Sequence, residues 1–321
     1  MKLSKMQKIS IVCWILLAIL AVILVCVVRT QNHKNAKPAM IYDGKAYQKK
    51  ENLTTILVLG IDQRGSIESG TGRAGSNGQS DMMWVVVIDK DTDEVQVITI
   101  PRETAVDVDE YYVDGKFYRT VKEQICLQYA YGRNSQEGCE LAKEKVEELL
   151  GIPMDYYCAF SMEAIPTIVD AVGGVTVTMT EDYEIPEHTY SAGETVTLTG
   201  EEAYEFVHFR DIERYGTNLE RMARQKEFLK ALVPTVKSKL KNNWLLPFQM
   251  YRDLEDCMTT DIPMRKLPSF AWTALKSDFD TENIIRIPGE DIHVDKYDQY
   301  IVEEKELKKM MVDIFYEVIK Y

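Results

Sequence analysis

The strongest hydrophobic signal along the chain is an uninterrupted apolar run near its beginning, residues 9–28, ISIVCWILLAILAVILVCVV. As a helix this run would be about 30 Å long, the thickness of a bilayer core. Residues 1–8 contain three lysines, so we expect them to stay in the cytoplasm and the rest of the chain to lie outside the membrane. A cleaved signal peptide is the alternative. The run is longer than the ~7–15 residues of such a signal and no small-residue cleavage site follows it, which favours an uncleaved, single-pass anchor.

A polar and basic stretch, residues 29–50, separates this run from the body of the chain, residues 51–321. We interpret it as a stalk between the membrane and the body. The body begins with a continuous β-branched run, TTILVLGI at 54–61, which is typical of a strand buried on both faces. Residues 62–80 are rich in Gly and Ser and have no periodicity, so they predict a loop, and loops of this length inside a domain are usually functional or mobile.

Strand and helix patterns alternate along the rest of the body. The further predicted strands are residues 82–89, 95–101, 175–180 and 284–287. The predicted helices are residues 135–150, 161–171 (interrupted at Pro166), 200–209, 217–241 and 302–321. Capping signals begin three of these helices, namely Asn134 with Glu137, Thr199 with Glu202, and Thr217 with Glu220. Such alternation predicts one α/β domain, a three-layer α-β-α sandwich around a mixed sheet.

Charge is unevenly spread along the chain. Residues 1–50 contain nine basic residues and one acid, a net charge of +8, which leaves −21 for residues 51–321 out of the total of −13. A body this acidic would repel the phosphates of a nucleic acid, so nucleic acid is not expected as a partner. Any anionic ligand would have to be held by a local cluster of basic side chains.

Four cysteines lie in the body, and their spacing includes no CxxC pair, so a zinc site is not expected. These are Cys126, Cys139, Cys158 and Cys257. If a disulfide forms, Cys126 and Cys139 are the most plausible pair, because they fall on neighbouring predicted helices. Buried free thiols fit the sequence equally well, so both interpretations stay open.

Most catalytic signatures are missing from the sequence. The four histidines are scattered, and there is no HExxH, GxSxG or GxxxxGK[ST] pattern. Acids and arginines remain at the ends of the predicted strands, where ligands of α/β sheets gather. They are Asp62, Arg64, Asp81, Arg102 and Glu103. Two carboxylates at one place would suit Mg²⁺, which is bound by one or two carboxylates together with phosphate oxygens.

A second group of arginines lies around the start of the long predicted helix. Arg221, Arg224 and Gln225 are spaced i, i+3, i+4, so they share one face near the helix N-terminus, where anions are favoured. Arg210 ends the preceding helix and could face the same place. Arginines with an acid pair fit a pyrophosphate and would stabilise charge on a leaving phosphate. Ordinary loop acids and a solvated helix face are the alternative interpretation.

The order of these motifs resembles the LytR–CpsA–Psr family. The motifs are LGIDQR, SD, ITIPRE, VDAVGGV, LTGEEA and R…RMARQ, spread over about residues 57–289 and preceded by one membrane helix. The resemblance implies a phosphotransferase with an α/β sandwich at the surface of a Gram-positive-type cell. Such enzymes move teichoic acid, capsule or a similar glycopolymer from an undecaprenyl-pyrophosphate carrier to peptidoglycan.

The resemblance also implies roles for residues. Asp62 and Asp81 would hold Mg²⁺ with the pyrophosphate, and Asp81 and three arginines would form the catalytic set. The phosphate-binding residues would be Arg64, Arg102, Arg210, Arg221, Arg224 and Gln225. This chain departs from the pattern at Glu103, where Asp is usual, and at His208, where Arg is common. VDAVGGV is interpreted as structural, because Gly173-Gly174 can provide a turn into a strand.

Two other functions fit the same residues. A pyrophosphatase would use water as the acceptor, and a non-catalytic protein would only bind lipid-linked wall polymer. The sequence does not name the polymer or its acceptor sugar.

Overall fold

The computed structural model describes residues 39–319 except 68–73, 187, 210–216 and 295–296. The predicted anchor, residues 9–28, lies outside the described residues. Among the residues that are described, no helix is both long enough and apolar enough to cross a membrane. The chain divides into two compact units, Asn52–Met310 and Met1–Glu51 with Met311–Tyr321.

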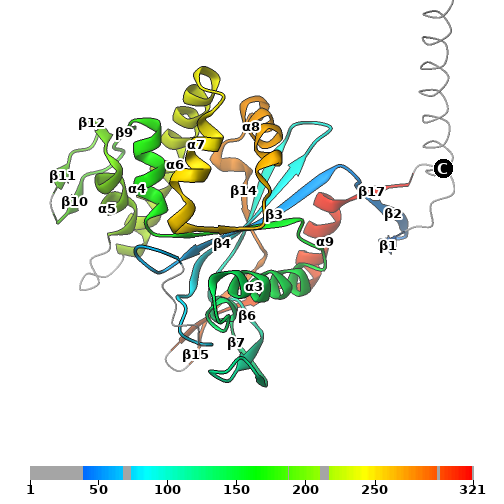
Figure 1. The fold of residues 1–321 in the computed structure, drawn as a ribbon. Coiled ribbons are helices and arrows are strands. Elements are labelled where there is room, and N and C mark those ends of the chain that lie inside the picture. The colour runs from blue at the N-terminus through cyan, green and yellow to red at the C-terminus, as the bar shows by residue number, and fades with distance from the viewer. Residues whose placement is uncertain (1–38, 68–73, 187, 210–216, 295–296, 320–321) are drawn as a thin grey trace, which may run out of the picture. The chain divides into compact units, whose positions relative to one another are not determined.

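The larger unit is built on a six-stranded mixed sheet with the order β13-β8-β3-β4-β5-β14 (Figure 1). Only the pairs β8–β3 and β5–β14 are parallel. The strands are β3 (Leu53–Ile61), β4 (Ser80–Asp89), β5 (Val95–Ile100), β8 (Tyr156–Ser161), β13 (Met258–Thr260) and β14 (Ile284–Arg286). The sheet confirms the predicted mixed α/β class. It also confirms four of the predicted strands, whose observed ends lie within two residues of the predicted ones.

Helices cover both faces of this sheet, α3 on one and α4 to α8 on the other (Figure 1). The short α2 precedes α3 in the chain. The helices are α2 (Leu127–Ala130), α3 (Ser135–Leu150), α4 (Ala164–Val172), α5 (Gly200–His208), α6 (Thr217–Asn242), α7 (Leu246–Asp253) and α8 (Leu267–Lys276). β3 is buried along most of its length, as its continuous apolar run predicts.

Four two-stranded antiparallel sheets also belong to the larger unit, and the sequence predicted only one of their strands, residues 175–180. They are β6 (Ala105–Tyr111) with β7 (Phe117–Gln124), β9 (Val175–Thr178) with β12 (Thr195–Leu198), β10 (Tyr183–Ile185) with β11 (His188–Tyr190), and β15 (Gly289–Val294) with β16 (Tyr297–Val302). Three short 3₁₀ turns complete the unit, Glu255–Cys257, Met264–Lys266 and Thr281–Asn283.

The predicted helix ends are confirmed where a cap is described. The Asn134 side chain accepts a hydrogen bond from the Glu137 amide at 2.8 Å, and Thr199 with Glu202 forms a capping box on α5. The helix predicted over 161–171 was placed too early. It begins at Ala164, so Pro166 lies in its first turn, where proline is tolerated.

The smaller unit contains a three-stranded sheet in the order β1-β2-β17. Its strands are β1 (Met40–Tyr42), β2 (Lys45–Lys49) and β17 (Tyr316–Val318). Residues 40–49 are therefore not a simple stalk. The helix predicted over 302–321 is also wrong at its end, because α9 spans Glu304–Phe315 and the chain then continues as β17.

The structure decides between the two interpretations of the cysteines. Cys126 is a buried free thiol and forms no disulfide with Cys139, as the free-thiol interpretation predicts. Burial raises the pKa of Cys126 to about 11, although the nearby Arg102 guanidinium opposes this shift. Cys126 is thus protonated at neutral pH and packs as a small apolar side chain.

Gly173 and Gly174 form the predicted turn between α4 and β9, with φ of 78° and 95°. A Cβ on Gly174 would lie 2.9 Å from Thr197 Cγ2 and 3.2 Å from the Leu198 carbonyl oxygen. Gly174→Ala should therefore lower the free energy of unfolding by about 2–3 kcal/mol. The matched control is Gly151→Ala, since Gly151 also has a positive φ but has open space around it, and it should cost about 1 kcal/mol. If denaturant titrations show that both variants lose the same free energy of unfolding, the close approach of position 174 to β12 is unimportant.

Candidate active site

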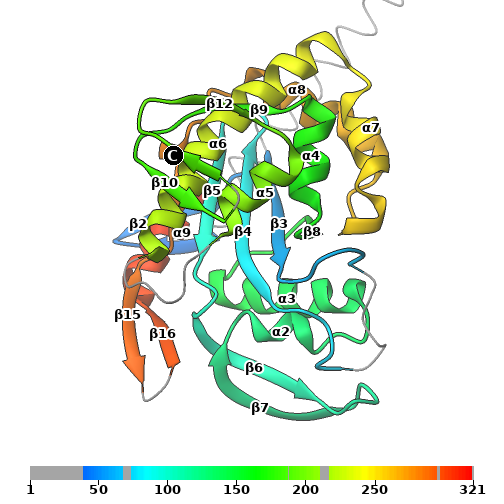
Figure 2. The same cartoon turned by 90° about the vertical axis from the view of Figure 1, so that its left-hand side faces the viewer.

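Three neighbouring strands bring their polar ends together at one end of the central sheet (Figure 2). β3 and β5 end there and the antiparallel β4 begins there. Asp62 directly follows β3, Asp81 is the second residue of β4, and Arg102 follows β5 by two residues. Ile61 is paired with Ser80, so Asp62 and Asp81 lie on adjacent strands. The structure thus brings these three predicted residues together.

Arg102 is held by polar partners on both sides. Its guanidinium forms an ion pair with Asp81 Oδ1 and donates to Gln79 Oε1 at 3.0 Å. Its Nε lies 3.6 Å from Glu103 Oε1. The Arg102 side chain is about one-third exposed, so its guanidinium is fixed in orientation while part of it faces solvent. This preorganisation suits an arginine that binds phosphate oxygens.

Asp62 is fixed by the returning end of the long loop. Its Oδ1 accepts a hydrogen bond from the Gln79 amide at 2.5 Å. A Cβ on Gly78 would lie only 2.6 Å from the same oxygen, so only glycine lets the backbone approach this closely. The loop therefore sets the position of the Asp62 carboxylate.

The electrostatics of Asp81 show which charges face it. Burial raises the pKa of Asp81 above its ordinary value of 3.8, and the neighbouring Asp62 carboxylate raises it further. The Arg102 and Arg221 guanidiniums act in the opposite direction. Arg221, from the first turns of α6, therefore belongs to the same cluster as the strand-end residues.

Helix α5 provides the other wall of this cluster. The Arg64 guanidinium lies 4.2 Å from the centre of the Tyr204 ring and 3.3 Å from Glu201 Oε2. The Tyr204 ring stacks on His208, with ring centres 4.9 Å apart. Partial burial lowers the pKa of His208, and the charges of Arg221 and Arg64 lower it further. His208 is therefore neutral at pH 7 and lies beside both arginines.

Arg224 and Gln225 join two helices instead of facing the strand ends. The buried Arg224 guanidinium donates from Nε to the Phe206 carbonyl at 2.6 Å and also bonds the Phe209 carbonyl. Gln225 Nε2 donates to the Val207 carbonyl at 3.1 Å. These carbonyls lie at the C-terminal end of α5. Carbonyl groups there have no hydrogen-bond partners within the helix and attract cations. The two side chains thus fasten α6 to α5; their predicted phosphate contacts stay predictions.

Replacing Arg224 should therefore affect stability strongly. Arg224→Ala removes two charge-assisted hydrogen bonds and leaves two carbonyls of α5 without these donors. We expect the free energy of unfolding to fall by about 3 kcal/mol. Gln225→Ala, which removes one neutral bond from the same helix, should cost about 1 kcal/mol. Denaturant titrations of both variants test this, and an Arg224→Ala loss no greater than that of Gln225→Ala would contradict the assignment.

Mg²⁺ fits the two carboxylates, although the protein offers few further ligands. The Asp62 charge raises the pKa of Asp81, an effect that a cation bound between the two carboxylates would relieve. Within the described part of the chain, no group of three or more His, Cys, Asp or Glu side chains could hold a metal ion. Mg²⁺ bound by one or two carboxylates takes its other ligands from substrate phosphates and water. Arg210, predicted as a further phosphate ligand, lies outside the described residues.

A model of the LytR_cpsA_psr family matches residues 24–314. The chain belongs to this family. The polyisoprenyl-teichoic acid–peptidoglycan teichoic acid transferase TagU of Bacillus cereus (strain AH820) is 29% identical to it over 205 residues, which are 64% of this chain and 57% of TagU. The chain thus spans a little over half the length of this curated relative.

Solved structures of similar fold cover most of this LytR_cpsA_psr protein. Protein gbs0355 of Streptococcus agalactiae has a TM-score of 0.64 and 21% identity, and the match covers 83% of this chain and 90% of gbs0355. TagV of Bacillus subtilis has a TM-score of 0.59 and 20% identity, with coverage of 82% and 97%. At this identity the likeness shows the fold alone.

Three residues that contact the candidate site were not identified from the sequence. Gln79 contacts both Asp62 and Arg102, while Glu201 and Tyr204 contact Arg64. Gln79 immediately precedes the SD motif, and this position was a signal that could have been used. Glu201 and Tyr204 lie within or beside LTGEEA, which the sequence analysis used as a helix start and as a family motif without assigning a binding residue to it.

Proposed function

We propose that this protein transfers a phosphoglycosyl polymer, such as teichoic acid, capsule or a similar wall glycopolymer, from an undecaprenyl-pyrophosphate carrier to a hydroxyl of peptidoglycan. One observation carries this proposal. Arg102 and Arg221 face Asp81 of the Asp62–Asp81 pair, and Arg64 and Arg221 face the adjacent His208, so that three separate elements bring arginines to this end of the sheet. In a body with a net charge of −21, such a concentration of guanidiniums implies an anionic ligand.

A pyrophosphate matches this cluster better than a single carboxylate or phosphate would. Arginines bind phosphate oxygens through their planar forks, and several of them can share the oxygens of two linked phosphates. The paired carboxylates Asp62 and Asp81 would otherwise repel such a ligand. Mg²⁺ held by these two acids would neutralise them and supply Lewis-acid stabilisation of phosphate charge.

The chemistry follows from where charge develops. The acceptor hydroxyl oxygen forms a bond to the phosphorus next to the sugar, and the bond from that phosphorus to the bridging oxygen breaks. The hydroxyl proton leaves to a base, and undecaprenyl phosphate is the leaving group. Arg102 and Arg221 stabilise the negative charge that grows on this leaving phosphate, which is the main contribution of the protein. Asp81 would be a poor base with a cation bound, so the base is not assigned to it.

The proposed location is the outer face of a cell membrane. Residues 9–28 would anchor the chain with residues 1–8 in the cytoplasm and the body outside. A lipid-linked donor and a wall acceptor meet only in this compartment. The name of the TagU relative, which refers to a polyisoprenyl-linked teichoic acid and peptidoglycan, supports the same donor and acceptor classes.

A transfer assay on the full chain in detergent micelles tests the proposal. It contains Mg²⁺, an undecaprenyl-pyrophosphate-linked sugar donor and peptidoglycan fragments. Sugar phosphate bound to the fragments is the expected product. Prenyl phosphate released without a wall product would indicate a pyrophosphatase, and donor binding without turnover would indicate a non-catalytic binder.

A further inference from the structure

Two tryptophans that are far apart in sequence form an exposed apolar patch at the end of the helical layer. Trp244 and Trp272 stack, with ring centres 6.1 Å apart and ring planes 25° apart. Each is about half exposed, and Leu245, which directly follows Trp244, is 63% exposed. We call these three residues the tryptophan patch. Large apolar side chains grouped on a surface in this way mark an interaction site.

The tryptophan patch rests on a packed base, so its exposure is a stable feature of the fold. Leu240, Leu246 and Ala271 are buried in one apolar cluster that joins the end of α6 to α7 and α8. Leu246 is 4% exposed while the adjacent Leu245 is 63% exposed. Trp272 follows buried Ala271 on α8. The backbone therefore presents the patch residues outward while their neighbours fill the core.

The two stretches of sequence that contain the tryptophans are basic, unlike the body as a whole. Residues 228–252 contain five basic residues and no acid, and residues 262–277 contain three basic residues and no acid. Both runs include one of the tryptophans, in a body whose net charge is −21. Lys276 Nζ lies 5.0 Å from the Trp272 ring centre and also 3.2 Å from Asp93 Oδ2.

We propose that the tryptophan patch and its basic surroundings bind the headgroup region of an anionic lipid bilayer. Tryptophan has an apolar ring and a polar N–H, and it is favoured at membrane–water interfaces. Lysines and arginines next to it gain about 1 kcal/mol each near an anionic lipid surface. Their aliphatic stems add apolar contact while their charged ends reach the headgroups. The combination matches a peripheral membrane contact separate from the predicted anchor.

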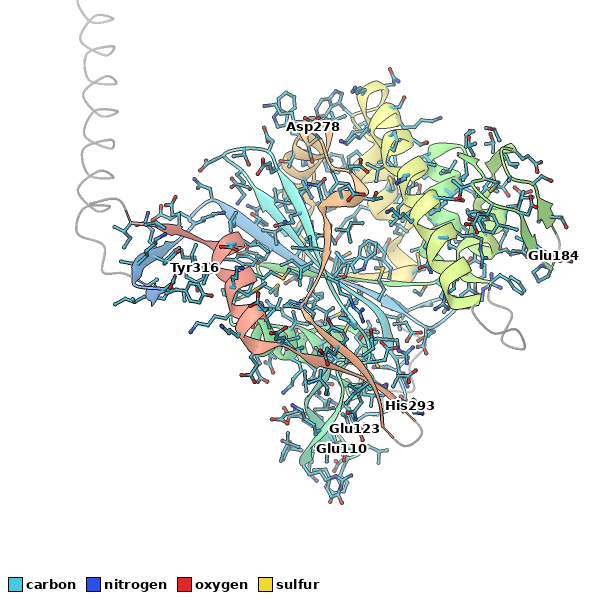
Figure 3. All side chains as sticks on the ribbon, turned by 180° about the vertical axis from the view of Figure 1, so that it is seen from behind. Glu110, Glu123, Glu184, Asp278, His293 and Tyr316 are labelled. Atoms are coloured by element: carbon cyan, nitrogen blue, oxygen red, sulfur yellow. The ribbon has the colours of Figure 1, made fainter. Side chains whose placement is uncertain are left out.

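The aromatic hairpin β6–β7 shows that exposed rings alone do not carry this inference. Tyr112, Phe117 and Tyr118 are about half exposed, yet residues 105–124 contain five acids and three basic residues. Its charge would be repelled by anionic lipid. Figure 3 places Asp278, two residues after α8, at the opposite end of the larger unit from Glu110 and Glu123 of this hairpin. The two aromatic surfaces therefore cannot face one membrane together.

The proposed membrane contact does not depend on the transfer activity. Arg221 of the candidate active site and Asn242 before the tryptophan patch lie at opposite ends of α6 (Figure 2). Helix geometry separates them by about 32 Å. Changes in the patch should therefore leave the arginine cluster intact, and failure of either proposal can be recognised without the other.

The test uses the full chain in nanodiscs with brominated lipid chains, which quench tryptophan that reaches the bilayer. Trp14→Phe removes the tryptophan of the predicted anchor and leaves Trp84, Trp244 and Trp272. Because two of these three lie in the patch, emission in phosphatidylglycerol discs should fall about twofold, with little change in phosphatidylcholine discs. Adding Trp244→Phe and Trp272→Phe should remove the quenching.

Charge reversal provides the matched comparison. Lys239→Glu with Lys241→Glu, at exposed positions on the last turns of α6 shortly before Trp244, should abolish the quenching in phosphatidylglycerol. Lys308→Glu with Lys309→Glu makes the same charge change at exposed positions of α9 and should leave it intact. Absence of quenching in phosphatidylglycerol, or equal quenching in both lipids that survives Lys239→Glu with Lys241→Glu, would overturn the proposal.

Discussion

Arg102→Ala should reduce the rate of polymer transfer by about 10²–10³-fold while the protein remains folded. Arg102 is fixed by Asp81 and Gln79, so its charge is already oriented when the donor binds. Removing it takes away a preorganised stabiliser of the leaving phosphate and leaves Asp81 without its main counter-charge. Initial rates of sugar-phosphate transfer, measured at saturating donor, report the effect.

Two further variants show whether the geometry of Arg102 or only its charge is needed. Arg102→Lys keeps the charge but not the planar fork, so it should recover only a small part of the rate. Arg119→Ala removes an arginine that is also paired, with Glu110, but on the exposed hairpin, and it should transfer at the normal rate. Normal transfer by Arg102→Ala, or an equal loss with Arg119→Ala, would exclude Arg102 from the site.

Asp81→Asn should lower transfer by about 10²-fold or more without lowering the thermal unfolding midpoint at pH 7. Burial and the Asp62 charge raise the pKa of Asp81. The stability that this group contributes is therefore present below its unfolded pKa and is lost as pH rises through the raised folded pKa. Ionised Asp81 is a cost at pH 7, and a neutral isostere removes that cost. A clearly lower unfolding midpoint for Asp81→Asn would show that Asp81 has mainly a structural role.

The same shift sets the direction of the pH dependence. Transfer needs ionised Asp81, so the rate should fall as pH decreases through a pKa above the ordinary aspartate value of 3.8. Asp62→Asn removes one cause of the raised pKa of Asp81. The residual transfer rate of this variant should therefore fall at a lower pH than the rate of the unchanged protein. A pH–rate profile of both proteins tests this, and an unchanged profile would mean that the two carboxylates do not interact.

The elements that the sequence predicted well have strong local causes. The apolar run of β3 and the Asn134 and Gly151 ends of α3 follow from contacts within a few residues, so pattern and capping rules suffice. The short hairpins and β17 depend on pairing with partners that the local pattern does not indicate. β17 pairs with β2, more than 260 residues away along the chain. Its residues continue an apparently helical pattern, and tertiary pairing overrides that propensity.

The candidate site shows the same division. Asp62, Asp81 and Arg102 could be placed together because each flanks a predicted strand and such ends meet in a sheet. The spacing of Arg221 and Arg224 predicted a shared helix face. Two side chains that are three positions apart on a helix nevertheless point in different enough directions that one can face a ligand and the other a neighbouring helix. Only the packing of α5 against α6 directs Arg224 to the carbonyls of Phe206 and Phe209.

The path of a single phosphorus atom tests the proposed transfer most directly. Two donors are prepared with ³²P either in the sugar-linked phosphate or in the lipid-linked phosphate, and each is incubated with the full chain, Mg²⁺ and peptidoglycan fragments. The account predicts that label from the sugar-linked phosphate becomes bound to the fragments, while label from the lipid-linked phosphate remains with undecaprenyl phosphate. Label that appears only in soluble sugar phosphate, or sugar that reaches the fragments without phosphorus, would contradict it.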